Sequence, residues 1–179
     1  MNNISHVSIH PVGLADTEDT FQLNFISEHT GSATLANLEQ DSNNQVIKSV
    51  EVPVLIGDEV LLKKAKSNTP IKLIKIDVEG FELRVLAGLK QTLTTHHPLV
   101  STEFIKENLQ RAGITRTQLT DFMLTLGYKP YGLGTQRKWL RHKLRLTELP
   151  EDIENAHTQD VLWIHQDSAE KSNMQKFIV

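Results

Sequence analysis

The chain has 179 residues, a formal net charge of -3 and no cysteine. The absence of cysteine excludes disulfides, thiolate metal sites and a cysteine nucleophile, and it is typical of proteins from a reducing compartment. The charge balance gives no reason to expect a nucleic-acid partner. Residues 1–10 contain neither the basic nor the apolar region of a secretory signal, and no stretch is long enough to span a bilayer, so we expect a cytoplasmic protein.

The first third of the chain predicts mainly β-structure. We expect strands at residues 7–12, 20–26 and 46–55 and a short helix over residues 58–65. The second of these strands alternates apolar and polar side chains, which is typical of a half-buried strand. The polar loop that precedes the third strand indicates an antiparallel excursion.

The most specific pattern begins at residue 71. An almost continuous apolar run over residues 71–78 is typical of a parallel strand covered on both faces, and Asp77 interrupts it near its end. Gly80 then releases the backbone, and apolar residues recur at helical spacing over residues 81–93. The sequence therefore predicts a strand, a tight turn and a helix.

A second strand, at residues 98–102, also ends at an acidic residue, Glu103. Ligands of open α/β sheets bind outside the carboxyl ends of the strands, so Asp77 and Glu103 fall at the functional edge of such a sheet. The alternative is that these acidic residues merely cap turns or helix starts, as acidic residues often do. His96 and His97, in the connection before this strand, could reach the same edge as general bases.

The C-terminal part predicts one more helix and two strands. A capping box that starts at Thr115 opens a helix that ends at Gly127. Strands follow at residues 128–133 and 161–165. No linker or internal repeat divides the chain, so we expect residues 1–179 to form one α/β domain.

Residues 136–145 form a basic segment in which five cationic side chains alternate with apolar ones such as Trp139. Runs of this kind usually lie on a solvated face with their apolar residues packed inward. The alternative is a surface, from Arg137 to Arg145, that binds anionic lipid or a phosphorylated glycan.

Residues 75–82, KIDVEGFE, followed by VLAG at 85–88, Pro98 and Glu103, resemble the signature of the FkbM-type methyltransferase family. The similarity continues upstream, in order, through residues 11–16, 31–35 and 50–58. The resemblance implies a class I, S-adenosylmethionine-dependent O-methyltransferase that acts on hydroxyl groups of polyketides, sugars or glycolipids. It also implies an α/β fold with a Rossmann-like sheet, mostly parallel with antiparallel additions.

Two elements of a class I methyltransferase have no counterpart in this sequence. They are the glycine-rich turn that holds the carboxypropyl end of the cofactor and the acidic residue that grips its ribose. Six residues precede the first predicted strand, whereas two βα units of about 30 residues each would need roughly 60 more. Gly132 and Gly134 are no substitute, since the third glycine of a dinucleotide fingerprint is absent. We therefore expect an incomplete sheet that corresponds to the C-terminal two-thirds of the family fold.

Two functional interpretations stay open. The chain is either an O-methyltransferase whose missing strands come from elsewhere, or a truncated, non-catalytic remnant that acts as an interaction module. In both cases the strand at residues 71–78 presents an uncovered apolar edge, which proteins seldom tolerate. We expect this edge to cause homo-association or to bind a complementing chain.

The candidate catalytic residues are Asp77, Glu79 and Glu103. Methyl transfer to a hydroxyl requires alignment of both partners and removal of a proton, which a carboxylate can accept. Converging carboxylates could instead hold a divalent cation, since Mg²⁺ prefers oxygen ligands, but we favour acid–base or positioning roles and predict no metal site. By resemblance, Gly13 and Leu14 lie near the adenine of S-adenosylmethionine, and Asp77 faces its methionine end.

Overall fold

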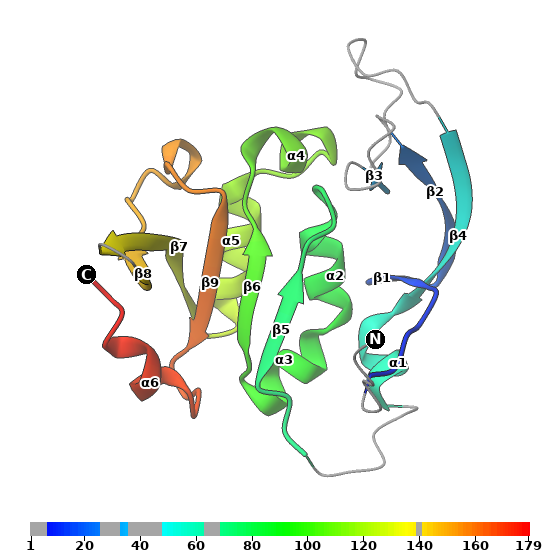
Figure 1. Ribbon diagram of the computed structural model, residues 1–179. Coiled ribbons are helices and arrows are strands. Elements are labelled where there is room, and N and C mark those ends of the chain that lie inside the picture. The colour runs from blue at the N-terminus through cyan, green and yellow to red at the C-terminus, as the bar shows by residue number, and fades with distance from the viewer. Residues whose placement is uncertain (1–6, 26–32, 36–47, 63–68, 139–140) are drawn as a thin grey trace.

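The computed structural model of the chain describes residues 7–25, 33–35, 48–62, 69–138 and 141–179 (Figure 1). The described strands form two separate sheets, one from the N-terminal part of the chain and one from the C-terminal part. Two residues of the basic segment, Trp139 and Leu140, lie outside the described residues.

The N-terminal sheet has four strands in the spatial order β1-β4-β2-β3. They are β1 (Gly13–Ala15), β2 (Asp19–Phe25), β3 (Ala33–Thr34) and β4 (Lys48–Ile56). Strand β1 runs parallel to β4, whereas β2 is antiparallel to both β3 and β4. The pairing of β2 with β4 confirms the predicted antiparallel excursion.

The first strand begins later than the sequence predicts. Residues 7–12 lie outside any strand, and Val7 and Ile9 are exposed. The N–H of Val12 donates to the carbonyl of His10 at 2.9 Å. This turn spans Pro11, which has no N–H to contribute to a ladder, so regular pairing starts only at Gly13.

Helix α1 (Gly57–Leu62) follows β4 directly, and its first turn contacts a helix of the other half of the molecule. The Asp58 carboxylate accepts hydrogen bonds from the backbone N–H of Gln91 at 2.7 Å and of Thr92 at 2.9 Å. Both donors lie in the first turn of α3 (Lys90–His96), where an anionic group also opposes the helix dipole favourably. Asp58 thereby ties the two halves together.

The C-terminal sheet has five strands in the spatial order β5-β6-β9-β7-β8. They are β5 (Leu73–Ile76), β6 (Leu99–Glu103), β7 (Tyr128–Lys138), β8 (Arg141–Glu148) and β9 (Asp160–His165). Five of the seven pairings among the described strands of both sheets are antiparallel, so the expectation of a mostly parallel sheet is wrong. The reason is that β8 returns from β7 as a hairpin and β9 enters between β6 and β7 in the opposite direction to both.

Helices cover one face of this sheet, and the C-terminal segment covers part of the other. The further helices are α2 (Glu82–Gly88), α4 (Lys106–Arg111), α5 (Arg116–Thr125), α6 (Lys171–Gln175) and the 3-10 helix η2 (Ile153–Asn155). The capping box predicted at Thr115 is present at the start of α5. No helix among the described residues is both long and apolar enough to cross a bilayer.

Helix α2 lies between the two sheets (Figure 1). Gly88, its last residue, packs so closely on the carbonyl of Ala15 in β1 that a Cβ there would collide with it. Strand β5 forms the neighbouring edge of the C-terminal sheet, and β6 is its partner among the described strands. Leu73 at this edge is 61% exposed, which leaves apolar surface there in contact with solvent.

Candidate functional site

The turn after β5 has an unusual backbone conformation. Glu79 and Gly80 both have positive φ angles, 52° and 105°. Glu79 is therefore a non-glycine residue in the left-handed region, which is uncommon. A Cβ on Gly80 would collide with the carbonyl oxygen of Asn108 in α4, so glycine at this position allows α4 to pack against the turn.

Three carboxylates meet at the point where β5 and β6 end. Asp77, Glu79 and Glu103 each place an oxygen within 4.8 Å of the others. The side-chain amide of Asn108 holds two of them together: its Nδ2 donates to Glu79 at 2.7 Å and to Glu103 at 2.9 Å. All three acidic residues singled out from the sequence thus lie in one cluster, at the edge where the strand pattern places them.

Like charges and burial make Glu103 a better proton acceptor than an ordinary glutamate. Burial raises the pKa of its carboxyl group most, and the nearby charges of Glu79, Asp77 and Asp160 raise the pKa further. The hydrogen bond from Asn108 opposes this shift because it favours the charged form. A raised pKa brings a carboxylate closer to the range in which a general base is effective at neutral pH.

Asp77 lies on the open side of the cluster. Its carboxylate accepts a hydrogen bond from Lys75 Nζ at 2.7 Å, and about half of the side chain is exposed. An ion pair this exposed contributes little to stability because water and salt screen it. Asp77 is thus available to a ligand at little cost.

Glu82 is a buried acid that the sequence reading did not place in the site. It is 1% exposed, and burial raises the pKa of its carboxyl group to about 7. Its Oε1 accepts the backbone N–H groups of Val78 and Gly80, both at 3.3 Å, whereas Oε2 has no partner among the described residues. Glu82 therefore holds the shape of the turn that carries Glu79.

The roles of Glu82 and Asn108 could hardly be predicted from the sequence. Glu82 belongs to the KIDVEGFE run, but an acid in the first turn of a helix is normally exposed. Asn108 lies in α4, a helix that the sequence analysis did not predict. The packing of α4 on Gly80, which brings Asn108 between the carboxylates, is a tertiary contact without a local signature.

Gly13 and Leu14 lie in β1 of the N-terminal sheet, where they pair with Val54 and Leu55 of β4. Strand β1 packs against Gly88, the last residue of α2, whereas the acidic turn comes just before the first residue of α2. A helix of this length spans about 10 Å. The structure therefore brings the acidic residues together but leaves Gly13 and Leu14 at a distance from them.

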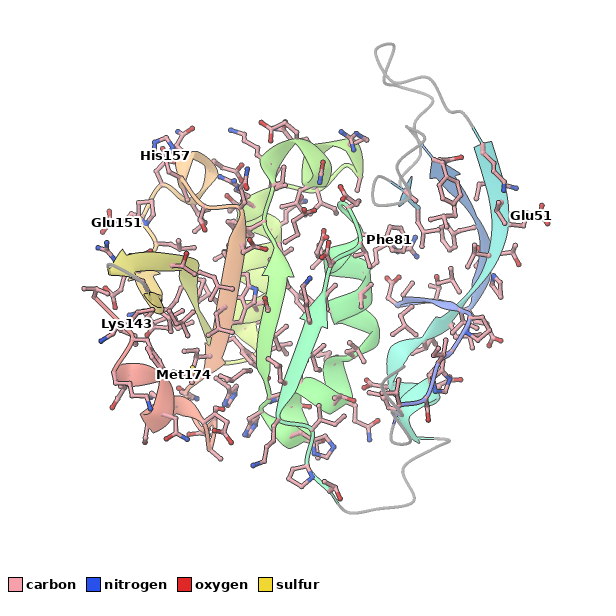
Figure 2. The ribbon with its side chains drawn as sticks, viewed as in Figure 1. Glu51, Phe81, Lys143, Glu151, His157 and Met174 are labelled. Carbon is pink, nitrogen blue, oxygen red and sulfur yellow. The ribbon has the colours of Figure 1, made fainter. Side chains whose placement is uncertain are left out.

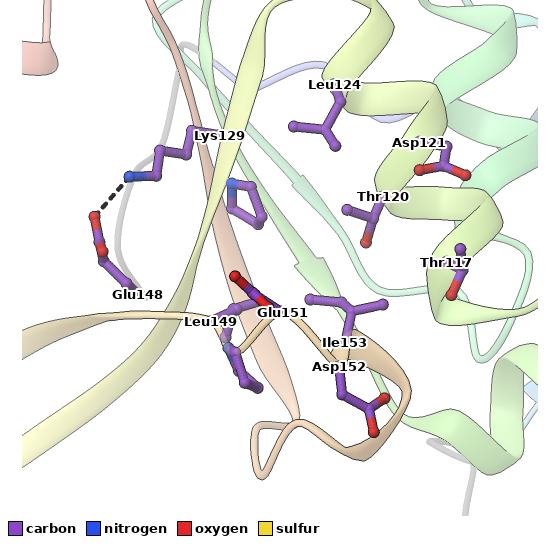
Figure 3. Close-up of a pocket in the computed structure, with 12 residues that line it drawn as sticks. Thr117, Thr120, Asp121, Leu124, Lys129, Glu148, Leu149, Glu151, Asp152 and Ile153 are labelled. Atoms are coloured by element: carbon purple, nitrogen blue, oxygen red, sulfur yellow. Dashed lines mark hydrogen bonds and ion pairs between the residues drawn. The ribbon is translucent and has the colours of Figure 1, made fainter.

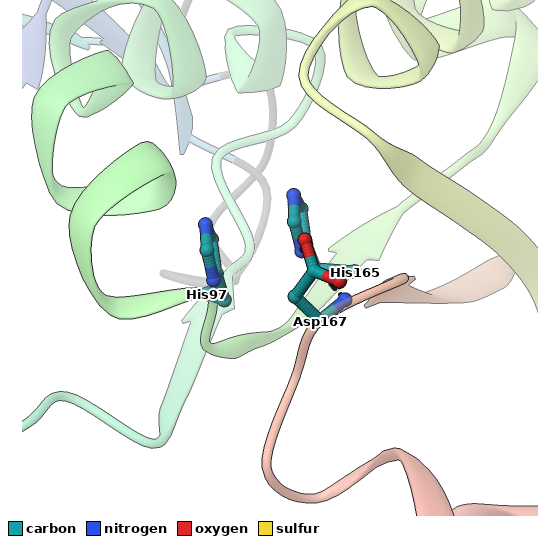
Figure 4. Close-up of side chains that lie close together, drawn as sticks. All are labelled: His97, His165 and Asp167. Carbon is teal, nitrogen blue, oxygen red and sulfur yellow. Dashed lines mark hydrogen bonds and ion pairs between the residues drawn. The ribbon is translucent and has the colours of Figure 1, made fainter.

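The histidines lie at the wrong end of the sheet to act on this cluster. His97 precedes β6, and Glu103 ends it, so the length of a five-residue strand, about 17 Å, separates them. His97 instead stacks on His165, with ring centroids 3.8 Å apart, and Asp167 lies beside the pair (Figure 4). The possibility that His96 or His97 acts as a base on the acidic residues, raised from the sequence, is therefore not supported by their position.

The described residues of the basic segment belong to β7 and β8, in which Lys138 pairs with Arg141. Lys143 and Arg145, whose side chains are described, are exposed, so these cations do lie in solvent. They belong to the outer strand of the sheet (Figure 2), on the far side of β9 from the acidic cluster.

A cavity of about 380 Å³ lies between α5 and the loop after β8 (Figure 3). Thr117, Thr120 and Asp121 line one side of it, and an ion pair of 2.6 Å between Lys129 and Glu148 lies on the other. None of the three clustered carboxylates lines this cavity.

Comparison with known protein families identifies the chain. The family described as Methyltransferase FkbM domain matches residues 2–130, which is more than half of the chain. The matched span contains the acidic cluster, Glu82 and Asn108, and it ends within β7. Searches of the curated proteins and of the solved structures found no match.

Proposed function

The chain belongs to the FkbM methyltransferase family, and on this basis we propose that it is an S-adenosylmethionine-dependent O-methyltransferase with a class I, Rossmann-like fold. Its acceptor is a hydroxyl group of a sugar, a glycolipid or a polyketide-like molecule. The observation that carries the proposal is the cluster of Asp77, Glu79 and Glu103 at the carboxyl ends of two parallel strands, inside the span that matches the family. Ligands of open α/β sheets bind at this edge.

Glu103 is the proposed general base. When the acceptor hydroxyl is methylated, its proton would pass to the Glu103 carboxylate. Burial and the neighbouring charges raise the pKa of this group, which makes it a stronger proton acceptor than an ordinary glutamate. Glu79 shares the amide of Asn108 with Glu103 and so fixes its position.

S-adenosylmethionine, when bound, supplies an electrophilic methyl group on a sulfonium. The residues present fit this cofactor in part. The exposed carboxylate of Asp77 can accept hydrogen bonds from its ammonium group. Gly13 contributes only its backbone, since a Cβ there would lie 2.8 Å from Val54 Cγ2, a space that the valine already fills.

We assign the carboxylates to acid–base and positioning roles rather than to a cation. The Nδ2 of Asn108 donates into the space between Glu79 and Glu103. An amide donor and a divalent cation compete for the same carboxylate lone pairs, so a cation at this point would require the Asn108 amide to turn its Nδ2 away.

One observation favours a second reading, in which the chain is a subunit or an interaction module. The edge of β5 exposes Leu73, and exposed apolar edges are sites of strand addition. In this reading a second copy or a complementing chain pairs with β5. The anionic-lipid surface at Arg137 to Arg145 belongs to the same proposal as a second contact.

Calorimetry with S-adenosylmethionine, combined with light scattering to give the oligomeric state, tests these readings. Binding in the micromolar range, with loss of affinity in Asp77→Asn, supports the methyltransferase. Binding by the associated form alone supports completion by another chain. Absence of binding in both the monomeric and the associated form contradicts the enzymatic function and leaves the interaction module.

A further inference from the structure

A polar cleft adjoins the acidic cluster on the side away from β5. It has a volume of about 590 Å³ and lies between the start of α4, strand β7 and the loop that leads into β9. Four polar side chains that line it are exposed to solvent: Glu107, His157, Gln159 and Asp160. His157 lies at the end of the sheet where β5 and β6 finish (Figure 2).

Asp160 lines the cleft and is the neighbour of Glu103, a member of the acidic cluster. It is the first residue of β9 and lies directly opposite Glu103 in the antiparallel register. Paired residues of this kind project from the same face, with Cβ atoms about 5 Å apart. The N–H of Phe104 donates to the carbonyl of Gln159 at 2.7 Å, which fixes the strands together at this point. The cleft therefore opens one side chain away from the proposed base.

Arg116 builds the wall of the cleft. It is 7% exposed, and its guanidinium donates to the carbonyls of Phe104 at 2.8 Å, Ala156 at 2.7 Å, Thr158 at 3.1 Å and Glu154 at 3.3 Å. These bonds tie the end of β6 to the loop before β9, so the cleft is shaped before any ligand enters. They also use four of the five guanidinium N–H groups, which leaves little donor capacity for an anionic ligand.

The charged side chains that line the cleft determine which ligands it can bind. Glu107 and Asp160 are anionic, and the only cation among the described lining residues, Arg116, is engaged with carbonyls. A phosphate or carboxylate ligand would therefore meet net repulsion. Hydroxyl groups can donate to both carboxylates, and Gln159 and His157 offer donors and acceptors at the rim.

We propose that this cleft is the acceptor subsite and that it takes a neutral, polyhydroxylated molecule such as a sugar ring. Asp160 accepts a hydrogen bond from one hydroxyl and presents the neighbouring hydroxyl to Glu103. Asp160 is thus a specificity-determining residue, and Arg116 is a positioning residue that acts through the loop. The transfer step rests on the proposed function, whereas the binding of the ring does not.

Saturation-transfer NMR with two matched probes tests the proposal: methyl α-D-glucopyranoside, which is neutral, and glucuronate, which carries a carboxylate on the same ring. We expect the neutral probe to bind and Asp160→Asn to weaken it about tenfold, the typical value of a hydrogen bond to a charged group. Glucuronate should bind more weakly than the neutral probe and gain affinity in Glu107→Gln. Asp121→Asn, an exposed acid in the other cavity, is the matched control and should change neither.

Three results would each contradict the assignment of the cleft as the acceptor subsite. They are tighter binding of glucuronate than of the neutral probe, no binding of the neutral probe, and equal binding of the neutral probe by the Asp160→Asn and Asp121→Asn variants. Because Glu107 and Asp160 lie in different elements, a folding defect in one variant leaves the other informative. The readout needs no methyl transfer. If the neutral sugar binds but S-adenosylmethionine does not, the proposed function is contradicted and the acceptor cleft is not. If S-adenosylmethionine binds but the sugar does not, the acceptor cleft is contradicted and the proposed function is not.

Discussion

The two ends of the C-terminal sheet each gather three potential ligand groups, yet only one end has the properties of a reactive site. At the carboxyl ends of β5 and β6, the atoms of Asp77, Glu79 and Glu103 lie within 4.8 Å of one another. At the opposite end, His97, His165 and Asp167 meet the same limit (Figure 4). Proximity alone therefore does not distinguish the two groups.

The difference lies in what the atoms already bind. The Nδ1 of His165 accepts the N–H of Asp167 at 3.0 Å, and burial followed by the charge of His97 lowers the pKa of the His165 ring, which favours the neutral form. The ring is buried and closely packed, since a Cβ on Gly127 would lie 2.7 Å from its Nε2. A left-handed residue occurs at both ends, Glu79 with a φ of 52° and His97 with a φ of 46°, so backbone strain does not separate them. The acidic end differs in having an exposed aspartate and a glutamate whose pKa is raised, whereas the histidine ring is buried and already hydrogen-bonded.

Replacing the proposed base gives the largest expected effect. Glu103→Gln should lower the rate of methyl transfer by about 10²–10⁴-fold, the usual range for removal of a general base. Release of S-adenosylhomocysteine measures the rate, and calorimetry should show that cofactor binding is kept. Glu151→Gln, an exposed acid in the other cavity, is the control. Full activity of the Glu103 variant would contradict the assignment of the acidic end as the reactive one.

A pair of glycine substitutions isolates the strained turn. Gly80→Ala adds a methyl group that meets the Asn108 carbonyl, and its φ of 105° is unfavourable for alanine. We expect a loss of about 2–4 kcal/mol in the free energy of unfolding, since strain and overpacking add. Gly113→Ala has a φ of 74° with nothing within 4 Å of the new Cβ, so its cost should stay near the conformational strain of about 1–2 kcal/mol. Urea unfolding compares them, and equal losses would show that contact with α4 does not matter.

The two ends should have opposite pH dependence. Glu82 has a folded pKa of about 7, raised from 4.5 by burial, so the folded state binds more protons than the unfolded state between these values. Stability is therefore lost as pH rises through this window, by as much as about 3 kcal/mol. Glu82→Gln should remove that loss in urea titrations at a series of pH values. An unchanged slope would show that the buried carboxyl does not titrate as proposed.

His165 should contribute a smaller slope of the opposite sign. Burial and the charge of His97 lower its folded pKa, so the unfolded state binds more protons below the ordinary value of 6.5. Stability is then lost as pH falls below this value. His165→Gln should flatten only the acidic limb, and methyl transfer should not change. A loss of activity without a loss of stability would instead give the histidine end a functional role.

Chelation should have the smallest effect. Because the Asn108 amide already occupies the space between Glu79 and Glu103, we expect turnover in EDTA to equal turnover without it. Addition of Mg²⁺ to the chelated protein is the reciprocal control. Activity that vanishes in EDTA and returns with Mg²⁺ would replace the acid–base assignment with a cation site.

Several features could be predicted because their signals are local. The apolar run that ends at Asp77, the strand that ends at Glu103 and the capping box at Thr115 depend on spacings of a few residues. The convergence of Asp77 and Glu103 followed from the parallel direction of two successive strands. The predicted helix over residues 81–93 exists, although Leu89 divides it into α2 and α3.

The features that could not be predicted depend on which elements meet. Asp160 is more than fifty positions from Glu103 in the chain, and only the antiparallel entry of β9 places them side by side. Residues 7–12 have a strand-like sequence but no partner strand among the described residues. Their alternating side chains therefore do not pack into a sheet.

The sequence by itself determined the family, the acidic residues and the edge of the sheet at which they lie, because short-range periodicity and motif spacing encode these properties. Tertiary structure alone decided the environment of each acid. It buried Glu82, placed Asn108 between Glu79 and Glu103, and set Asp160 at the mouth of a cleft. The physical reason is that pKa, hydrogen-bond partners and exposure depend on groups brought together from distant parts of the chain.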